Sequence, residues 1–250
     1  MPEPLATLPD HVDWCAHAVF LDFDGTLTPI VCRPEAVVVD ERTHRALERL
    51  QDLTDNALAV ISGRAVADLE RHLVPTVCAL SGSHGLEFKR GGQVDQAGLD
   101  AREVLQPALT EISNFAAKHS LRMEDKPGAV TLHFRDRPDL ADACGALVDR
   151  IVAGDDALRS MHGNMISEVA PAGIDKGAAL KRFMEDAPFK GRIPIMVGDD
   201  VTDEDAFKAA NDLGGFGIKI GPGPTAATFH AADTEGFLAW LWQMAAMPES

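Results

Sequence analysis

The chain has 250 residues, of which 46% are apolar, and this is enough to form the core of one large domain or of two smaller ones. Its formal net charge of -16 describes an acidic surface, which repels nucleic acid and anionic lipid. Neither is therefore an expected partner, and no apolar run approaches the length of a membrane span.

The four cysteines are scattered and contain no CxxC pair, a pattern that argues against a zinc site and against a disulfide framework. Residues 1–14 are acidic and rich in proline, unlike a signal peptide. Together these features predict a cytoplasmic protein.

The first part of the chain alternates short apolar runs with helical patterns. Residues 19–23 predict a buried parallel strand, and residues 40–53 have apolar side chains at helical spacing. A second strand is expected at 57–61, a helix at 65–73 and a third apolar segment at 77–80. Strands and helices in this order, joined by short polar turns, predict βαβ units and a parallel sheet.

The middle of the chain has a different pattern, in which helices and strands alternate at 100–119, 129–135, 140–152 and 165–169. Residues 129–135 alternate between apolar and polar side chains, as a half-exposed antiparallel strand does. We therefore expect residues 93–171 to form a separate α+β domain. It is inserted into a catalytic domain made of residues 1–92 and 172–250.

The first pattern returns after Pro171. Helices and strands are expected at 176–187, 193–197, 204–211, 216–220 and 235–242. These elements would complete the parallel sheet of the catalytic domain.

Two carboxylates directly follow the first apolar run. Asp22 and Asp24 are two residues apart, so a strand projects them to the same side, and Gly25 allows a sharp turn just after them. Unpaired buried charge is costly, so a buried strand that ends in two acids needs a cation nearby. The sequence thus predicts a site at the carboxyl end of this strand.

Further polar residues follow the other expected strands or open the helices after them, where ligands of open α/β sheets bind. They are Ser62, Gly63, Arg64, Lys176, Asp199, Asp200 and Asp203. The aspartates cannot all be ionised side by side without a counter-cation, and ligands that are all oxygen favour a hard ion such as Mg²⁺. A hydroxyl group, a turn amide, Arg64 and Lys176 suit a phosphate. The combination predicts metal-assisted phosphoryl transfer.

Four motifs resemble those of haloacid dehalogenase-like phosphatases, and they occur in the family's order. They are DFDGT, a Ser-Gly-Arg after the next strand, a lysine after an inserted segment, and GDDVTDE after a late strand. Other stretches are similar to trehalose-6-phosphate phosphatases: SGSHGLE (81–87), EDKPGAVTLHFR (124–135), residues 164–168 and APFKGRIPIMVGDDVTDEDAF (187–207). The resemblance covers most of residues 18–242.

This resemblance implies an α/β fold, a Rossmann-like parallel-sheet core with an inserted C2-type cap. It also implies Mg²⁺-dependent hydrolysis of trehalose 6-phosphate, in which Asp22 forms an aspartyl-phosphate. Asp24 would protonate the leaving sugar and then deprotonate water, while Ser62 and Lys176 would hold the phosphoryl oxygens. The implied metal ligands are Asp22, Asp24 (through its backbone carbonyl) and Asp199, with Asp200 and Asp203 binding directly or through water.

The cap would close over the sugar and exclude water. The expected substrate-binding residues are Gly63, Arg64, His84, Gly85, Glu87, Lys126, Asn164 and Glu168. A small-molecule substrate is the expected partner, and a trehalose-6-phosphate synthase that supplies it is a further candidate.

Simpler interpretations stay open for single residues. Asp203 also suits a helix cap, Lys176 a solvated helix surface, and Ser62 with Gly63 an ordinary turn. Alternative functions are another sugar-phosphate phosphatase of the same superfamily (of the sucrose- or mannosylglycerate-phosphate type), a phosphomutase, and a non-catalytic sugar-phosphate sensor. A sensor predicts a damaged site, whereas Asp22, Asp24 and the other expected catalytic residues are all present.

Overall fold

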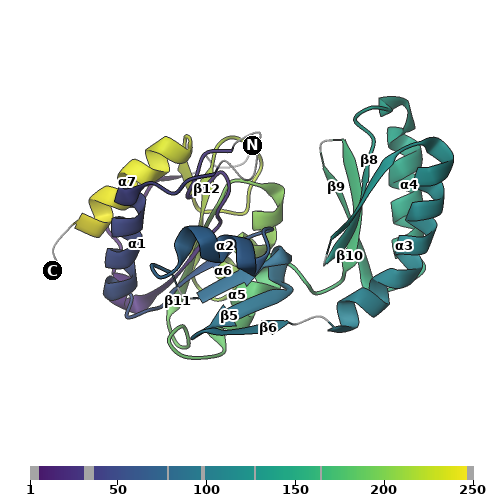
Figure 1. Ribbon diagram of the computed structural model, residues 1–250. Helices are drawn as coiled ribbons and strands as arrows, with labels where there is room; N and C mark the ends of the chain where they lie inside the picture. Colours follow the sequence, from purple (N-terminus) through teal and green to yellow (C-terminus); the bar gives the residue numbers. More distant parts are fainter. Residues whose placement is uncertain are drawn as a thin grey trace. The chain divides into compact units, whose positions relative to one another are not determined.

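The computed structural model describes residues 6–30, 37–77, 79–96, 99–126, 128–163 and 165–246 (Figure 1). The chain divides into two compact units, which are Met1–Asp95 with Asp175–Ser250 (unit 1) and Gln96–Ile174 (unit 2). The insert expected from sequence, 93–171, begins and ends three residues earlier than unit 2. No helix within these described ranges is long and apolar enough to span a membrane.

Unit 1 contains a nine-stranded sheet with the order β1-β13-β12-β11-β2-β3-β4-β5-β6. Its strands are β1 (Ala6–Thr7), β2 (His17–Leu21), β3 (Leu58–Ile61), β4 (Ala79–Gly82), β5 (Glu87–Arg90), β6 (Gln93–Gln96), β11 (Ile193–Gly198), β12 (Phe216–Ile220) and β13 (Phe229–Ala231). Neighbouring strands from β1 to β4 run parallel, whereas β5 runs antiparallel to β4. The predicted α/β fold with a parallel sheet is confirmed.

Strand β2 lies in the middle of this sheet, between β11 and β3, and is buried on both faces. Leu21 pairs in register with Val197 of β11 and Val60 of β3. Leu21 belongs to the apolar cluster on one face, while the ring of Phe20 on the other face contacts that of Phe183, 5.9 Å away between centroids. The apolar residues of this run do not alternate with polar ones, and they form a strand that is buried on both faces of the sheet.

Helices cover both faces of the sheet of unit 1. They are α1 (Glu41–Leu53), α2 (Val66–Leu73) and α7 (Thr234–Ala246) on the face of Leu21, and α5 (Lys176–Met184) and α6 (Glu204–Asp212) on the face of Phe20. Three of them begin at an aspartate whose side chain accepts a hydrogen bond from a backbone N–H of the first turn. Asp40 caps α1, Asp175 caps α5 at 2.7 Å from the Ala178 nitrogen, and Asp233 caps α7 at 2.7 Å from the Gly236 nitrogen. Short 3-10 helices occur at Trp14–Ala16, Ser83–Gly85, Pro138–Leu140 and Val201–Asp203.

Unit 2 is a four-stranded antiparallel sheet with two helices. The strand order is β7 (Arg122–Lys126), β8 (Ala129–His133), β10 (Ile166–Pro171), β9 (Leu158–Gly163), and the helices are α3 (Leu99–His119) and α4 (Ala141–Val152). Val130 and Leu132 of β8 pack with the helices in one apolar cluster. Thr131, between them, is also fully buried. The expectation of a half-exposed strand is therefore wrong for residues 130–132.

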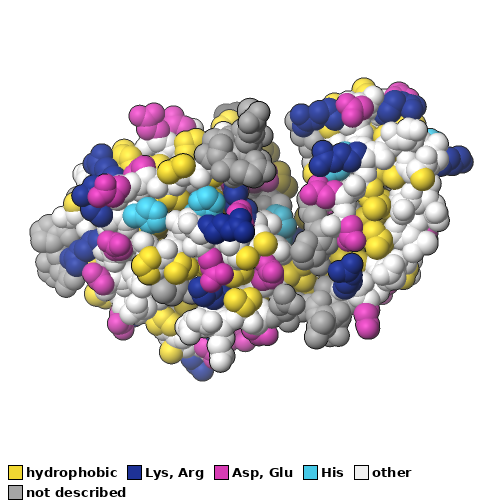
Figure 2. Space-filling view, viewed as in Figure 1, with side chains coloured by type: hydrophobic (Ala, Val, Ile, Leu, Met, Phe, Trp, Pro, Cys, Tyr) yellow, Lys and Arg dark blue, Asp and Glu magenta, His cyan; other side chains and the backbone are white. Residues whose placement is uncertain are grey.

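The charged side chains of unit 1 show no single-sign patch on the face drawn in Figure 2, where acidic side chains alternate with basic ones. That face therefore offers no extended basic patch to an anionic ligand.

Candidate active site

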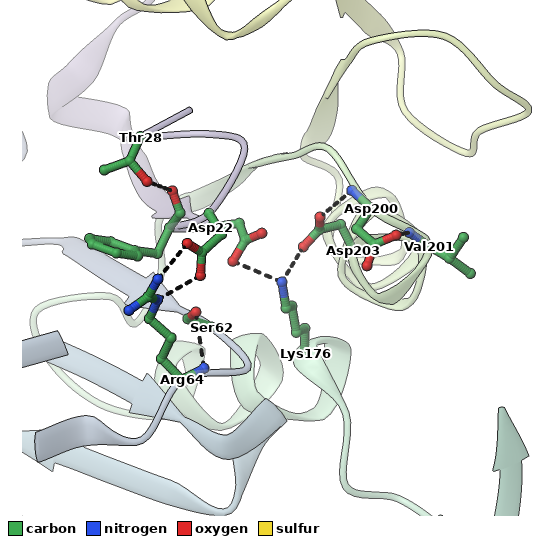
Figure 3. A network of polar contacts seen from close by, with 10 residues as sticks. Asp22, Thr28, Ser62, Arg64, Lys176, Asp200, Val201 and Asp203 are labelled. Carbon is green, nitrogen blue, oxygen red and sulfur yellow. Dashed lines mark hydrogen bonds and ion pairs between the residues drawn. The ribbon is translucent and has the colours of Figure 1, made fainter. Parts of the chain in front are cut away.

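A pocket of about 360 Å³ opens at the carboxyl ends of β2, β3 and β11 in unit 1. Its lining residues are Asp22, Asp24, Ile30, Ser62, Gly63, His84, Lys176, Asp199, Asp200 and Thr202. The strand-end motifs thus meet at one place, as expected for a parallel sheet. Figure 3 shows that Asp22 and Lys176 point toward one another there.

Lys176 is the buried cation of the pocket. Its Nζ lies 2.9 Å from Asp22 Oδ1 and 2.7 Å from Asp203 Oδ1, and its side chain is 2% exposed (Figure 3). Burial alone would lower the pKa of Lys176, but the two carboxylates outweigh it and raise that pKa. Lys176 therefore stays charged, and its interpretation as a solvated surface lysine is wrong.

Three carboxylates form a cluster beside this lysine. Asp22, Asp199 and Asp203 each offer an oxygen, and the three oxygens lie within 4.8 Å of one another. Burial raises the pKa of Asp22 to about 8, against the opposing charge of Lys176. Burial, with the charges of Asp203 and Asp200, raises the pKa of Asp199 to about 6, against the opposing charges of Lys176 and Lys219.

The carboxylate cluster fits a hard divalent cation. Asp199 Oδ1 is buried and has no hydrogen-bond partner within the described part of the chain, so it is available as a ligand. Carboxylate oxygens without histidine or cysteine favour such an ion. A cation would also remove the repulsion that raises the pKa of these acids.

The raised pKa of Asp199 predicts a pH dependence of stability in the absence of divalent ions. A carboxyl group with a higher pKa in the folded protein (about 6) than in the unfolded chain (3.8) binds more protons when folded. Its contribution to the free energy of unfolding therefore falls as the pH rises between these values. We expect Asp199→Asn, which does not titrate, to gain stability relative to wild type across this range, measured by urea unfolding in EDTA. A difference that stays constant with pH would contradict the assignment.

Asp200 and Asp203 both accept hydrogen bonds from backbone N–H groups of the turn after β11. Asp200 Oδ1 accepts a hydrogen bond from the Val201 nitrogen, and Asp203 Oδ2 accepts one from the Asp200 nitrogen at 2.9 Å (Figure 3). Asp203 is therefore both a helix cap and a member of the cluster. The Asp200 carboxylate is not in the cluster, so its role as a metal ligand stays a prediction.

Asp24 is held by Arg64 in a bidentate ion pair. Arg64 Nε and Nη2 donate to the two carboxylate oxygens at 2.6 and 2.8 Å, and Nη1 donates to Asp68 at 2.7 Å. The guanidinium also lies over the ring of Phe23, 5.1 Å from its centroid. In the structure Arg64 fixes the Asp24 carboxylate, and its expected contact with substrate stays a prediction.

The residues that follow β3, together with the loop after β4, form a tightly packed wall of the pocket. Ser62 is buried, and its Oγ accepts a hydrogen bond from the Arg64 nitrogen at 3.2 Å. A Cβ on Gly63 would lie 2.6 Å from the ring of His84, so the histidine packs directly on the backbone there. Gly85 has a φ of +111° and brings this loop close to the carbonyl oxygen of Asp175.

Glu87 has a structural role in the described contacts. Its Oε2 accepts hydrogen bonds from the Val66 nitrogen at 2.8 Å and from Ser83 Oγ at 3.3 Å. It thereby caps the start of α2, which carries no capping side chain at Ala65. Contact with substrate, which the sequence suggested, stays a prediction for this residue.

The expected sugar-binding residues of unit 2 are described only in part. Asn164 and the side chain of Lys126 lie outside the described residues. Glu168 on β10 is 5% exposed and accepts a hydrogen bond from Thr131 Oγ1 of the neighbouring strand. Binding of sugar by these residues stays a prediction.

Sequence reasoning missed two residues that hold the pocket loops. Lys219 Nζ donates a hydrogen bond to the carbonyl oxygen of Asp199, and Thr234 Oγ1 donates one to the carbonyl oxygen of Gly25 at 2.5 Å. A signal existed for Lys219, because a single charged residue in the apolar run FGIKI is unusual in a buried strand. Thr234, which opens α7, gave no comparable signal.

Gly25→Ala should disrupt the pocket. Gly25 has a φ of +78°, and a Cβ there would lie 2.1 Å from Asp199 Oδ2. We expect kcat of any phosphatase reaction to fall about 10²-fold or more, because a displacement of about 1 Å in a catalytic site costs that much. The control is Gly91→Ala, which shares a positive φ (+53°) but meets nothing within 4 Å. Equal kcat values for the two variants would contradict the prediction.

Comparison with known proteins identifies relatives along nearly the whole chain. A family model described as trehalose-phosphatase matches residues 20–235. The chain is 36% identical over 245 residues to a protein of Escherichia coli K12 named trehalose-6-phosphate phosphatase, covering 96% of this chain and 90% of that protein. It is also 36% identical over 209 residues to a probable trehalose-phosphate phosphatase of Sinorhizobium fredii, covering 82% and 78%. The fold matches the C-terminal domain of Candida albicans trehalose-6-phosphate phosphatase with a TM-score of 0.80, at 24% identity and coverage of 99% and 100%.

Proposed function

The chain belongs to the trehalose-phosphatase family, and on that basis we propose that it hydrolyses trehalose 6-phosphate to trehalose and phosphate through an aspartyl-phosphate on Asp22. The observation that carries this proposal is the buried contact of Asp22 with Lys176 at the edge of the carboxylate cluster. A carboxylate nucleophile and a phosphate dianion repel each other unless positive charge lies between them. The pocket supplies that charge on one side of Asp22.

The reaction proceeds in two displacements. An oxygen of Asp22 attacks phosphorus, the bond to the sugar oxygen breaks, and the proton of Asp24 passes to the leaving sugar. Water then attacks the phosphorus of the aspartyl-phosphate, Asp24 takes its proton, and phosphate leaves with Asp22 restored. Lys176 and the Ser62 hydroxyl hold the phosphoryl oxygens in both steps.

Asp24 must change partners during this cycle. Both of its oxygens accept hydrogen bonds from Arg64, a state that suits the carboxylate acting as base. To carry a proton to the sugar, the group gives up at least one of these bonds. Arg64 thus positions Asp24 between turnovers, and Asp68 in turn holds Arg64.

Asp22, Asp199 and Asp203 are the proposed ligands of Mg²⁺, together with the backbone carbonyl of Asp24 and, directly or through water, Asp200. Bound there, the cation would neutralise the cluster and offset charge on the phosphate. Unit 2 is the proposed cap that closes over the sugar. Its proposed sugar-binding residues are Lys126, Asn164 and Glu168.

A trehalose-6-phosphate synthase is the proposed source of substrate. A relative from Thermoproteus tenax, 32% identical over 233 residues, is named bifunctional trehalose-6-phosphate synthase/phosphatase, and this chain covers 31% of it. That combination in one polypeptide supports the proposal of a functional link.

Release of phosphate from a panel of substrates tests the proposed function. We expect kcat/KM for trehalose 6-phosphate to be about 10²-fold or more higher than kcat/KM for sucrose 6-phosphate or glucose 6-phosphate. Differences in the contacts to substrate hydroxyl groups give discrimination of this order. EDTA should abolish the activity, and added Mg²⁺ should restore it. Preference for another sugar phosphate would contradict the substrate assignment, and full activity in EDTA would contradict the metal.

A further inference from the structure

Lys219 is a second buried cation near the carboxylate cluster. It lies in β12 and is 5% exposed, and it pairs in register with Gly198, the last residue of β11. Its Nζ reaches across this pair of strands and donates a hydrogen bond to the carbonyl oxygen of Asp199. The lysine therefore contacts the main chain of a residue of the carboxylate cluster.

The partner of Lys219 does not neutralise it. In the part of the chain that the structure describes, no carboxylate lies within 4.0 Å of its Nζ, and its hydrogen-bond acceptor is a neutral carbonyl group. An ammonium group taken out of water without an ion-pair partner is costly. A position in β12 filled by an apolar residue would avoid this cost, so packing alone does not account for the lysine.

Asp199 is held from two directions. The backbone of Gly25 lies against its carboxylate, where a Cβ would come within 2.1 Å of Oδ2, and Lys219 holds its carbonyl oxygen. Between these contacts the carboxylate faces Asp22 and Asp203, and its Oδ1 is buried without a described partner. Loss of the contact from Lys219 would free the residue to rotate away from the cluster.

We propose that Lys219 is a positioning residue for the metal site, which fixes the Asp199 main chain so that its carboxylate stays directed at Asp22 and Asp203. This inference rests on the proposed function, because it assumes that the carboxylate cluster holds Mg²⁺. Lys219 does not line the pocket, and in the described contacts its ammonium group reaches only Asp199, so we infer that it acts through Asp199. Replacement of a residue that orients a metal ligand typically lowers metal affinity or activity about 10- to 100-fold.

Titration of metal-stripped protein with Mg²⁺ in a calorimeter tests the proposal. Lys219→Met removes the charge and the donor, and Lys219→Gln removes the charge but keeps a shorter donor. We expect both to bind Mg²⁺ about 10- to 100-fold more weakly than wild type, and Lys219→Arg to recover most of the affinity. KM for trehalose 6-phosphate at saturating Mg²⁺ should stay unchanged, because Lys219 does not contact substrate.

The matched control is Lys208→Met, which removes the same charge from an exposed position on α6 (64% exposed) and should leave Mg²⁺ binding unchanged. Wild-type affinity in both the Met and Gln variants would overturn the proposal. If far-UV circular dichroism shows that Lys219→Met does not fold, Lys219→Gln decides by the same criterion. Failure of the wild-type protein to hydrolyse trehalose 6-phosphate would overturn the proposed function, whereas the Mg²⁺ titrations would still decide the role of Lys219.

Discussion

Replacing Asp22 with Asn should abolish turnover of trehalose 6-phosphate and leave the fold intact. The amide has the same shape as the carboxyl group but cannot attack phosphorus, so no aspartyl-phosphate forms. We expect kcat to fall by at least about 10⁴-fold, as loss of a nucleophile does in other hydrolases. Single-turnover release of phosphate measures this loss, and far-UV circular dichroism checks the fold.

The stability of the same variant provides a second readout. Burial raises the pKa of Asp22 to about 8, so the ionised form that predominates in the unfolded chain at neutral pH is disfavoured in the folded protein. Asp22→Asn should therefore be no less stable than wild type in EDTA. Asp212→Asn is the control, because it removes an exposed acid (67% exposed) that does not line the pocket. Wild-type turnover by Asp22→Asn would disprove the nucleophile assignment.

Lys176→Met should lose both activity and stability. Without the ammonium group, the phosphoryl oxygens lose a charged donor, and removal of one such donor costs about 10²- to 10³-fold in kcat. The Asp203 carboxylate also remains buried without its cation, and Asp22 loses the charge that favours its ionised form. Breaking a buried ion pair in this way costs about 3–5 kcal/mol of the free energy of unfolding.

Urea unfolding in EDTA separates this stability loss from any effect of metal. The control is Lys181→Met on the same helix, where an exposed lysine lies 3.5 Å from Asp212. A surface ion pair of that kind contributes at most about 1 kcal/mol. If Lys176→Met were as stable as Lys181→Met, the buried pair would not support the fold, and its burial would need another explanation.

The strand ends could be predicted from sequence because their pattern is local. A short, mostly apolar run such as 19–23 suits a buried strand of a parallel sheet, and the position of the acids at its carboxyl end follows directly from the chain direction. Lys176 follows no such pattern, because a lone lysine on a helix carries no signal of burial. Its place after the insert was the only indication, and the structure shows why it counts: the helix begins at the pocket.

Other features depend on contacts between distant residues and could not be read from local patterns. The family resemblance suggested Arg64 and Glu87 as substrate-binding residues and gave no indication of their structural contacts. Their partners, Asp24 and the start of α2, are 40 and 21 residues away in sequence. Strands β7 and β9, with the sequences RMEDK and LRSMHG, carry too many polar residues to show a strand period.

The junction between the two units has a consequence for protein engineering. Unit 2 ends at Ile174, and Asp175 and Lys176 follow at once, with Asp175 capping the helix that carries the proposed catalytic lysine. Chimeras that take their insert from another phosphatase should therefore be joined before residue 96 and after residue 174. We expect a graft that replaced Asp175 as well to loosen the start of α5 and so to lower the rate of the chimera. If unit 2 recognises the sugar, as proposed, specificity can be exchanged without loss of rate only when Asp175 is kept.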